Sequence, residues 1–401
     1  VPNLRFPEFQ GEWEESTIGE MFDLYSGNTP SRLNKEHFKG AVNWISSGEL
    51  KDHYIYSSKE QISEEAAKNL KLLPVGTFVI AIYGLEAEGV RGTGSITQEP
   101  STISQACMSF IPKGVIENEF LYSWYKKHGN VIGIRYAQGT KQQNLSYDIL
   151  EKFRIAYPNT KEQEKLNKFI SLLDKRIATQ NKIIDKLQSL IKGLEDNLLD
   201  NPLWEKTYLR SFMQFFSTNS LSWEQLSYEE GEIRNLHYGL IHGFQTRGIN
   251  SASLPMIKNE AIPKQYTLCQ VGDVAFADAS EDTGEIAKSV EFVDTIEGDT
   301  ICGLHTIHGR DIKNRTVVGF KGFAFNSRYF HNQIKRLAQG TKVFSITTNN
   351  LSSCYVYLPD LDTQTVIVRL LKSYEEQLII DRMILKQYEK QKQYLLRQMF
   401  I

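Results

Sequence analysis

Two stretches of the chain show the hydrophobic spacing of a long coiled-coil helix. In the first, apolar residues recur at alternating steps of four and three, which are the a and d positions of a heptad repeat. These positions are Leu166, Ile170, Leu173, Ile177, Gln180, Ile184, Leu187, Ile191, Leu194 and Leu198. Moved by 201 residues, they become Ile367, Leu371, Tyr374, Leu378, Asp381, Leu385, Tyr388, Lys392, Leu395 and Met399. Gln180 and Asp381 align, so we expect the helices to pair around a buried polar layer that fixes their register.

Start signals precede both helical stretches. In the first, Pro158 ends the strand-like run KFRIAYP, and residue 159 or 160 is then expected to cap the helix, with Gln163 as capping-box partner of Thr160. In the second, Pro359 is followed by Asp360 and Asp362, either of which is placed to cap similarly. Each helix is expected to have about 40 residues, which at ~1.5 Å per residue gives roughly 60 Å.

The helices belong to a longer internal repeat. The pentapeptide AQGTK begins at Ala137 and again at Ala338, and from there the two copies align without a gap through both helical stretches. Upstream the likeness is looser: EWEESTIGEMFDLYSGNT resembles LWEKTYLRSFMQFFSTNS. The chain therefore divides into head, helix, head and helix, with predicted boundaries at 1–158, 159–200, 201–359 and 360–401.

The heads combine short β-branched and aromatic runs, such as TFVIAIY and CYVYLP, with glycine-rich turns and one expected helix from Asn118. We therefore predict an α+β fold. Two globular α/β domains are separated by two long α-helices, which pair as an antiparallel coiled coil and give the chain an internal pseudo-twofold repeat.

Composition limits the function without naming it. The formal net charge of -2 lacks the basic excess of a protein that binds nucleic acid alone through electrostatics. Cys107, Cys269, Cys302 and Cys354 form no CxxC pair, so we predict neither a disulfide framework nor a zinc site. No apolar run approaches the roughly 18 to 20 residues of a membrane span, and the first residues do not resemble a signal peptide. A cytoplasmic protein is expected.

Catalytic and cofactor motifs are missing from the sequence. There is no GxxxxGK phosphate loop, so ATP hydrolysis by this chain is not expected. The segments RGTGS and DNPLW are the nearest matches to methyltransferase motifs, and both are interpreted as turns. Glu49 and Lys51 form an acidic-x-Lys pattern that arises often by chance. His242 and His308 have no Cys or carboxylate at ligand spacing, so we interpret them as loop residues that stack or hydrogen-bond. We predict no catalytic residue, bound metal or cofactor.

Polar loops occupy matching places in the two heads. The hydrogen-bond donors and acceptors of Arg, Asn and Gln match those on the edges of guanine and adenine, and Lys and Thr are suited to bind phosphates. Such residues also occur in any exposed loop. Arg247 and Arg310 are the expected base readers of the second head. The candidate DNA contacts are Asn28, Thr29, Ser31, Arg32, Lys35, Arg91, Lys141, Gln142, Gln143 and Asn144, then His242, Gln245, Arg247, His305, His308, Arg310, Arg315 and Lys342.

The combination resembles the specificity subunit of a type I DNA restriction-modification system. The resemblance rests on LYSGNTPSR and NWISSGEL in the first head, on LHYGLIH and VGDVAFADAS in the second, and on AQGTKQQNLSYDILEKFRIAYPNTKEQ before the first long helix. It covers essentially the whole chain, and the duplicated order is more specific than any single motif.

The resemblance implies a division of labour. Each head would be a target recognition domain that reads one half of a bipartite site in double-stranded DNA, and the helices would form the spacer. Two methyltransferase subunits would dock on this chain and methylate adenine N6 with S-adenosylmethionine. Two restriction subunits would add translocation and cleavage that depend on ATP and Mg. Because the heads differ and the helices match, we expect an asymmetric, interrupted target.

Some apolar helix residues lie off the coiled-coil seam. A two-stranded coil would expose them, so we predict that they dock partner helices. They are Phe169, Leu172, Leu190, Leu370, Ile380 and Leu396. The shared AQGTK is instead interpreted as a turn centred on Gly139 and Gly340 that returns each head to its helix.

Two alternatives remain open at this level. A coiled-coil scaffold would organise other proteins without reading DNA sequence, and an autonomous enzyme would show turnover as an isolated chain. Salt-dependent DNA binding by the assembled complex counts against the first, and we expect no turnover of the second kind.

Overall fold

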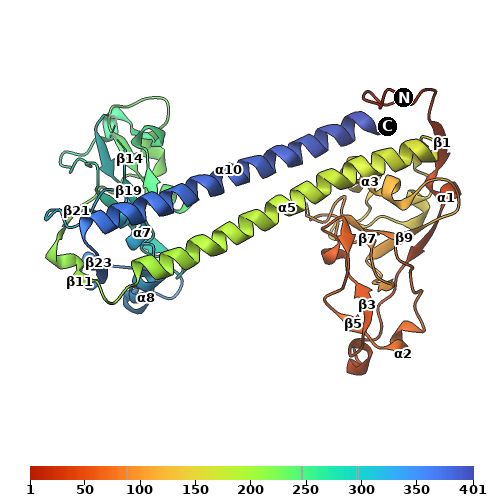
Figure 1. Cartoon of the computed structure of the whole chain (residues 1–401), viewed down its shortest axis with the longest axis horizontal. Coiled ribbons are helices and arrows are strands. Elements are labelled where there is room, and N and C mark those ends of the chain that lie inside the picture. Colours follow the sequence, from red (N-terminus) through yellow and green to blue (C-terminus); the bar gives the residue numbers. More distant parts are fainter. Residues whose placement is uncertain (88, 245–246, 295, 297) are drawn as a thin grey trace. The chain divides into compact units, whose positions relative to one another are not determined.

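Two compact units make up the chain, and each combines a globular head with parts of two long helices (Figure 1). The computed structural model describes residues 1–87, 89–244, 247–294, 296 and 298–401. The first unit comprises Val1–Asn181 with Ile384–Ile401, and the second comprises Lys182–Met383. Both divisions fall inside long helices, α5 (Thr160–Leu199) and α10 (Leu361–Met399). Each unit therefore contains the beginning of one long helix and the end of the other.

A five-stranded sheet of order β2-β9-β6-β7-β4 forms the centre of the first head. Only β4 and β7 run parallel in it. A sheet of order β5-β3-β8 and the ribbon β1-β10 complete the head, and α3 packs on β6, β7 and β9. The elements are β1 (Glu14–Thr17), α1 (Ile18–Met21), β2 (Phe22–Ser26), η1 (Lys35–Phe38), β3 (Val42–Ile45), η2 (Ser47–Glu49), β4 (Tyr54–Ile55), β5 (Gln61–Ile62), α2 (Glu64–Ala67), β6 (Phe78–Ala81), β7 (Gly94–Thr97), β8 (Ser101–Ile103), β9 (Cys107–Pro112), α3 (Asn118–Tyr136), α4 (Tyr147–Leu150) and β10 (Arg154–Tyr157).

The second head repeats this topology. Its five-stranded sheet has the order β12-β21-β17-β19-β15, and the ribbon β11-β23 takes the place of β1-β10. The sheet β13-β16-β14-β20 and the ribbon β18-β22 complete it. The elements are β11 (Glu205–Tyr208), η3 (Leu209–Ser211), β12 (Met213–Phe216), η4 (Trp223–Gln225), β13 (Leu226–Ser227), β14 (Arg234–Leu236), α6 (Tyr238–Gly243), β15 (Gly248–Ile249), η5 (Ser251–Ser253), β16 (Met256–Ile257), η6 (Asn259–Ala261), β17 (Val274–Ala277), β18 (Ala279–Ser280), β19 (Ser289–Phe292), β20 (Thr300–Cys302), β21 (Thr306–Asp311), α7 (Phe320–Ala324), α8 (Arg328–Leu337), β22 (Phe344–Ser345), α9 (Thr348–Ser353) and β23 (Tyr355–Leu358).

The two long helices pack against each other within each unit. In the first unit, Leu166 and Ile170 from the start of α5 share one core with Leu395 and Met399 from the end of α10. In the second unit, Leu199 from the end of α5 shares a core with Ile367 and Leu371 from the start of α10. The helices are therefore antiparallel, and the predicted α+β class with two long paired helices is confirmed.

The helix starts repeat one hydrogen-bonding arrangement. Asn159 Oδ1 accepts from the Glu162 N–H at 3.1 Å, and Asp360 Oδ1 accepts from the Thr363 N–H at 2.8 Å. The expected capping box of Thr160 with Gln163 is wrong, because residue 159 is the cap and the Gln163 side chain donates to the Pro158 carbonyl. Gln364 likewise donates to the Pro359 carbonyl. The amide oxygens of Gln163 and Gln364 accept from the backbones of Glu117 and Val317, which ties each head to its helix.

Candidate DNA interface

Sheet topology gathers the polar loops of the first head at one edge. Strand β2 ends with Ser26 paired to Met108, and β6 ends with Ala81 paired to Cys107, the first residue of β9. The segments that follow β2 and β6 and the segment that precedes β9 therefore leave the same edge of the sheet. We call this the loop edge of the first head; it comprises residues 27–35, 82–87, 89–92, 104–106 and 138–144.

The AQGTK turn and the residues that follow it, 138–144, contact the rest of the loop edge through the backbone. Asn144 forms bridges to both Gln138 and Tyr83. The Leu85 N–H donates to the Gln143 carbonyl at 3.0 Å, and the Gln143 N–H donates to Glu86 Oε2 at 2.9 Å. Lys141 and Gln142 are exposed at the tip of this turn, with side chains open to a ligand.

Arg32 has an acidic partner in the unbound protein. Its guanidinium forms two hydrogen bonds to Glu60, at 2.6 and 2.7 Å, and lies 4.2 Å from the centre of the Phe38 ring. The hydrogen bonds from Arg32 lower the pKa of Glu60. Both side chains are about half exposed, so a phosphate or base could replace Glu60 at little cost. Asn28, Thr29, Ser31 and Lys35 lie along the same segment, where the Trp44 indole N–H holds the Asn28 carbonyl at 3.0 Å.

Arg91 is less accessible than the other candidates of the first head. It is half-buried, and its Nη2 donates to the Glu86 carbonyl at 3.2 Å. Its side chain also lies against Gly133 of α3, where a Cβ would come within 3.0 Å of Arg91 Cγ. Arg91 therefore shapes the loop between β6 and β7 at the loop edge.

The second head builds its loop edge in the same way. Strand β17 ends with Ala277 paired to Thr306, the first residue of β21. After β17, the Asp278 N–H donates to the His305 carbonyl at 3.0 Å, and the Ile346 N–H donates to the Asp278 carbonyl at 3.0 Å. The ribbon β18-β22 then carries the second AQGTK turn, which includes the exposed Lys342. The loop edge of the second head comprises residues 217–221, 278–286, 303–305 and 338–345.

Two histidines of the second head lie near its loop edge. His305 is exposed at a left-handed φ of 53°, with Nδ1 3.1 Å from Asp278 Oδ1. His242, at the end of α6, lies 3.2 Å from Glu285 Oε2. Burial alone would raise the pKa of Glu285, but hydrogen bonds from Lys288 and His242 lower it.

Four candidates of the second head do not lie at its loop edge. His308 is 1% exposed, and its Nε2 lies 2.7 Å from Asp273 Oδ2, so burial excludes a direct DNA contact in this conformation. Arg310 is the fifth residue of β21, about 13 Å along the strand from the loop edge at ~3.3 Å per residue. It makes hydrogen bonds of 2.8 and 2.7 Å to Asp273.

Arg247 and Arg315 are engaged beside the long helices. Arg247 Nη1 donates to Glu375 on α10 at 2.8 Å, and its Nη2 lies 3.0 Å from Glu195 on α5. Arg315 pairs with Glu205 at 2.7 Å. Neither Arg247 nor Arg310 is therefore placed as the base reader expected from the sequence, because buried or half-buried carboxylates hold both guanidinium groups. Gln245, also predicted to contact DNA, lies outside the described residues.

The helix residues fall into two groups. All eleven predicted pairing residues are buried or half-buried: Leu166, Ile170, Leu173, Ile177, Gln180, Ile184, Leu187, Leu371, Leu378, Asp381 and Leu385. Of the predicted docking residues, Leu172, Leu190, Leu370 and Ile380 are exposed. The docking prediction is wrong for Leu396, because this side chain is 5% exposed and belongs to the first core. Phe169 is partly covered by an edge contact with Phe6.

Aromatic residues that pack beside His305 of the second loop edge were not among the predicted contacts. Trp223 packs on His237, with ring centres 4.4 Å apart, and Tyr238 meets both His237 and His305 at 4.7 and 5.3 Å. Trp223 is 45% exposed. Two of these rings, His237 and Tyr238, come from the motif LHYGLIH, whereas Trp223 comes from a separate segment.

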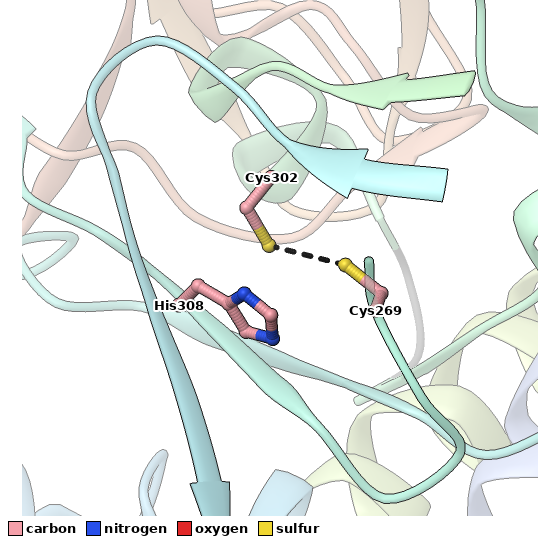
Figure 2. Close-up of side chains that lie close together, drawn as sticks. All are labelled: Cys269, Cys302 and His308. Atoms are coloured by element: carbon pink, nitrogen blue, oxygen red, sulfur yellow. Dashed lines mark hydrogen bonds between the residues drawn. The ribbon is translucent and has the colours of Figure 1, made fainter. Parts of the chain in front are cut away.

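One group of histidine, cysteine and acidic side chains, among the residues that the structure describes, lies close enough to hold a metal ion. Cys269, Cys302 and His308 are all buried, and their ligand atoms lie within 4.8 Å of one another (Figure 2). Cys269 and Cys302 are 33 residues apart, so the group has no CxxC motif. These three residues come together only in the folded head, so spacing along the chain could not predict the group.

Residues 10–189 match the family described as the type I restriction modification DNA specificity domain. The MjaIX specificity subunit of Methanocaldococcus jannaschii is 29% identical over 44% of this chain and 42% of that protein. The EcoR124I/EcoR124II specificity subunit of Escherichia coli is 31% identical over 46% of this chain and 45% of that protein. These two matches span less than half the length of either relative. The MjaVIII specificity subunit of M. jannaschii is 24% identical over 97% of this chain and 91% of that protein.

Solved structures share the fold over the full length. The type I restriction-modification S subunit from M. genitalium has a TM-score of 0.59 at 15% identity and covers 100% of this chain and 99% of its own. A second chain, from work on complex assembly and conformational transition of the type I R-M system, also has a TM-score of 0.59, at 13% identity and 97% coverage of both chains.

No helix among the described residues is both long and apolar enough to cross a bilayer. The relatives named above are specificity subunits, which agrees with the prediction of a non-catalytic chain. Residues 10–189 are therefore similar to the type I restriction modification DNA specificity domain, and nearly the whole chain is similar to the MjaVIII specificity subunit.

Proposed function

We propose that this chain is the non-catalytic DNA-reading subunit of a type I restriction-modification complex. Each head reads one half of an asymmetric bipartite target in double-stranded DNA. One observation carries the proposal: both heads present a loop edge of the same topology, with an identical AQGTK turn but different polar side chains around it. A shared frame with divergent loops is expected of two readers of different sequences.

The accessible residues narrow the contact set. In the first head, Lys141 and Gln142 at the turn and the segment from Asn28 to Lys35 supply phosphate and base contacts. In the second head, Lys342 and His305 do so. Arg247 and Arg310 leave the set of direct readers because buried carboxylates hold them. Arg315 leaves it because it follows the end of β21 that lies away from the loop edge.

Partner docking belongs to the long helices. Leu190, Leu370 and Ile380 are 46, 38 and 49% exposed on the second unit, which supports a surface for partner helices. We propose two methyltransferase subunits as these partners and two restriction subunits bound through them. S-adenosylmethionine, ATP and Mg are expected in those subunits.

Methylation mapping on a randomised DNA library tests the proposal with the assembled methyltransferase complex. Gln142 and Val343 occupy the same position of the two turns, so Gln142→Ala and Val343→Ala form a matched pair. Gln142→Ala should relax one half of the methylated sequence, and Val343→Ala should leave that half unaltered. Loss of a base contact of ~1 to 3 kcal/mol corresponds to roughly a ten- to hundredfold loss of preference.

Two results would contradict the proposal. Equal relaxation of both halves by Gln142→Ala would rule out one reader per half. Sequence-independent methylation by the wild-type complex would favour the coiled-coil scaffold instead.

A further inference from the structure

The Cys269–Cys302–His308 cluster has the ligand chemistry of a zinc site. Zn–S bonds of ~2.3 Å in a tetrahedral site place two thiolate sulfurs roughly 3.7 Å apart. The sulfurs of Cys269 and Cys302 lie 3.6 Å apart, so an ion fits between them without displacing either. The histidine nitrogen lies within 4.8 Å of both sulfurs, and a site needs about 3.5 Å. The imidazole therefore has only about 1.3 Å to close.

The histidine is already held as a metal ligand would be. Its Nε2 lies 2.7 Å from Asp273 Oδ2, which leaves Nδ1 on the edge of the ring that faces the sulfurs (Figure 2). Asp273 in turn accepts hydrogen bonds from Arg310 at 2.8 and 2.7 Å. A carboxylate on the outer nitrogen fixes the tautomer and orientation of a ligating histidine, and most metal-bound histidines have such a partner.

The first head supplies an internal comparison at the same positions. Val79 pairs with Ser109 in β6-β9, and Ala275 pairs with His308 in β17-β21, so Ser109 corresponds to His308. By the same strand positions, the first head has Leu73, Thr77, Ile103 and Ser109 where the second has Cys269, Asp273, Cys302 and His308. Four positions thus change together, from ordinary packing residues to three ligands and their outer carboxylate.

Charge favours a divalent ion, and Zn²⁺ suits this set of sulfur and nitrogen ligands. Cys269 and Cys302 lie in an apolar cluster with Leu236, Ala275 and Val290, where an uncompensated charge is costly. Two thiolates, a neutral imidazole and Zn²⁺ sum to zero, whereas Cu⁺ with the same ligands leaves a net negative centre. The Asp273–Arg310 pair beside it is also neutral.

We propose that the second head binds one zinc ion through Cys269 Sγ, Cys302 Sγ and His308 Nδ1, with a water molecule as the fourth ligand. Binding releases the two thiol protons to solvent. The ion joins the segment before β17 to the end of β20 and the middle of β21, and it acts as a structural clamp of the second head. This inference does not depend on the proposed DNA reading.

Metal analysis of the full chain tests the site. The chain, alone or with its methyltransferase partner, is purified without chelators and without a histidine tag, and its metals are counted by inductively coupled plasma mass spectrometry. We expect about one zinc per chain. Cys302→Ser should reduce this at least tenfold, and Asp273→Asn should weaken zinc affinity roughly 10- to 100-fold in competition with a chromophoric chelator. Cys107→Ser, at a buried cysteine of the first head, should retain the zinc.

A second measurement covers variants that fail to fold. Wild-type protein exchanged with Co²⁺ should develop thiolate-to-cobalt charge-transfer absorption, because two sulfurs coordinate the ion. Absence of that band, background zinc in the wild-type chain, or copper or iron in place of zinc would each overturn the assignment. Equal zinc loss in Cys107→Ser would do so as well.

Discussion

Gly139 and Gly340 account for the repetition of AQGTK. Both adopt left-handed backbone, with φ of 116° and 129°. A Cβ at Gly139 would lie 2.1 Å from the Gln142 carbonyl oxygen, and one at Gly340 would lie 1.9 Å from that of Val343. The shared pentapeptide therefore encodes a tight backbone turn, which does not constrain the side chains that differ after it.

Gly139→Ala tests the turn. We expect a loss of roughly 1 to 3 kcal/mol in the free energy of unfolding, because alanine meets both an unfavourable φ and a backbone clash. Gly193→Ala is the control, since a Cβ there meets nothing within 4 Å on exposed α5, and it should stabilise by up to about 1 kcal/mol. Urea denaturation measures both; equal effects of the two substitutions would contradict the explanation.

Single residues also mark the limit of sequence prediction. The turn glycines and the match of Gln163 to Gln364 could be predicted because their partners lie within a few residues or repeat at a fixed offset. The role of Arg247 could not, since Glu195 and Glu375 lie far from it in the chain. Similarly, the partners of His308 come from other strands of the sheet, and only the folded head brings them together.

At the scale of elements, Arg247 connects the second head to both long helices. Glu195 and Glu375 are largely buried, and burial raises the pKa of each carboxyl group. Arg247→Met should therefore destabilise the second unit by roughly 2 to 3 kcal/mol, below the ~3 to 5 kcal/mol of fully buried pairs because Arg247 is partly exposed. Arg315→Met, which removes the exposed pair with Glu205, should cost at most about 1 kcal/mol. Thermal unfolding compares the two variants. Similar losses of stability in both would argue against a buried ion pair between Arg247 and the two glutamates.

His53 predicts a pH dependence for the first unit. It stacks between Tyr54 and Tyr122, and its nitrogens lie 2.8 Å from Glu119 on α3 and from Asp174 on α5, which Lys392 of α10 also contacts. Burial lowers the pKa of His53, but the two carboxylates outweigh it and raise the pKa above its usual 6.5. The stabilisation is thus complete below pH 6.5 and is lost as the pH rises through the raised value.

Amide hydrogen exchange in α3 measures this effect. Protection in the wild-type chain should fall as the pH rises above 6.5, once the intrinsic exchange rate is corrected. His53→Gln should remove the excess dependence. Asp174 does not confuse the result, because its pKa is lowered and its contribution is lost only in acid. An unchanged pH profile in His53→Gln would refute the assignment.

Elements differ in how well the sequence predicts them. The long helices could be predicted because a heptad pattern repeats over 40 and 39 residues. The strands of the heads have two to six residues, too few to establish an alternating pattern, and their pairing depends on partners elsewhere in the chain. The loop edges follow from that pairing, so they emerged only with the sheets.

For the whole molecule, the exposed apolar helix residues predict assembly. Ile380→Ser should weaken binding of the proposed methyltransferase partner roughly ten- to hundredfold, as burial of an isoleucine contributes ~1.5 to 3 kcal/mol. Folding should persist, since Ile380 is 49% exposed. Lys386→Ser, at an exposed position about 120° around α10 from Ile380 by helical periodicity, is the control. Isothermal titration with the purified partner measures the affinity of each variant. An unchanged affinity in Ile380→Ser would show that Ile380 is not part of the docking surface.

The two-part composition of the first unit has a consequence for biosynthesis. Residues 384–401 contribute Leu395, Leu396, Met399 and Phe400 to the core of the first head, and Phe120 and Phe400 lie 5.3 Å apart between ring centres. On the ribosome these residues emerge only after the whole second unit has been translated. The core of the first head therefore stays incomplete until the end of synthesis. A nonsense mutation near residue 384 would consequently destabilise the domain that is encoded at the opposite end of the gene.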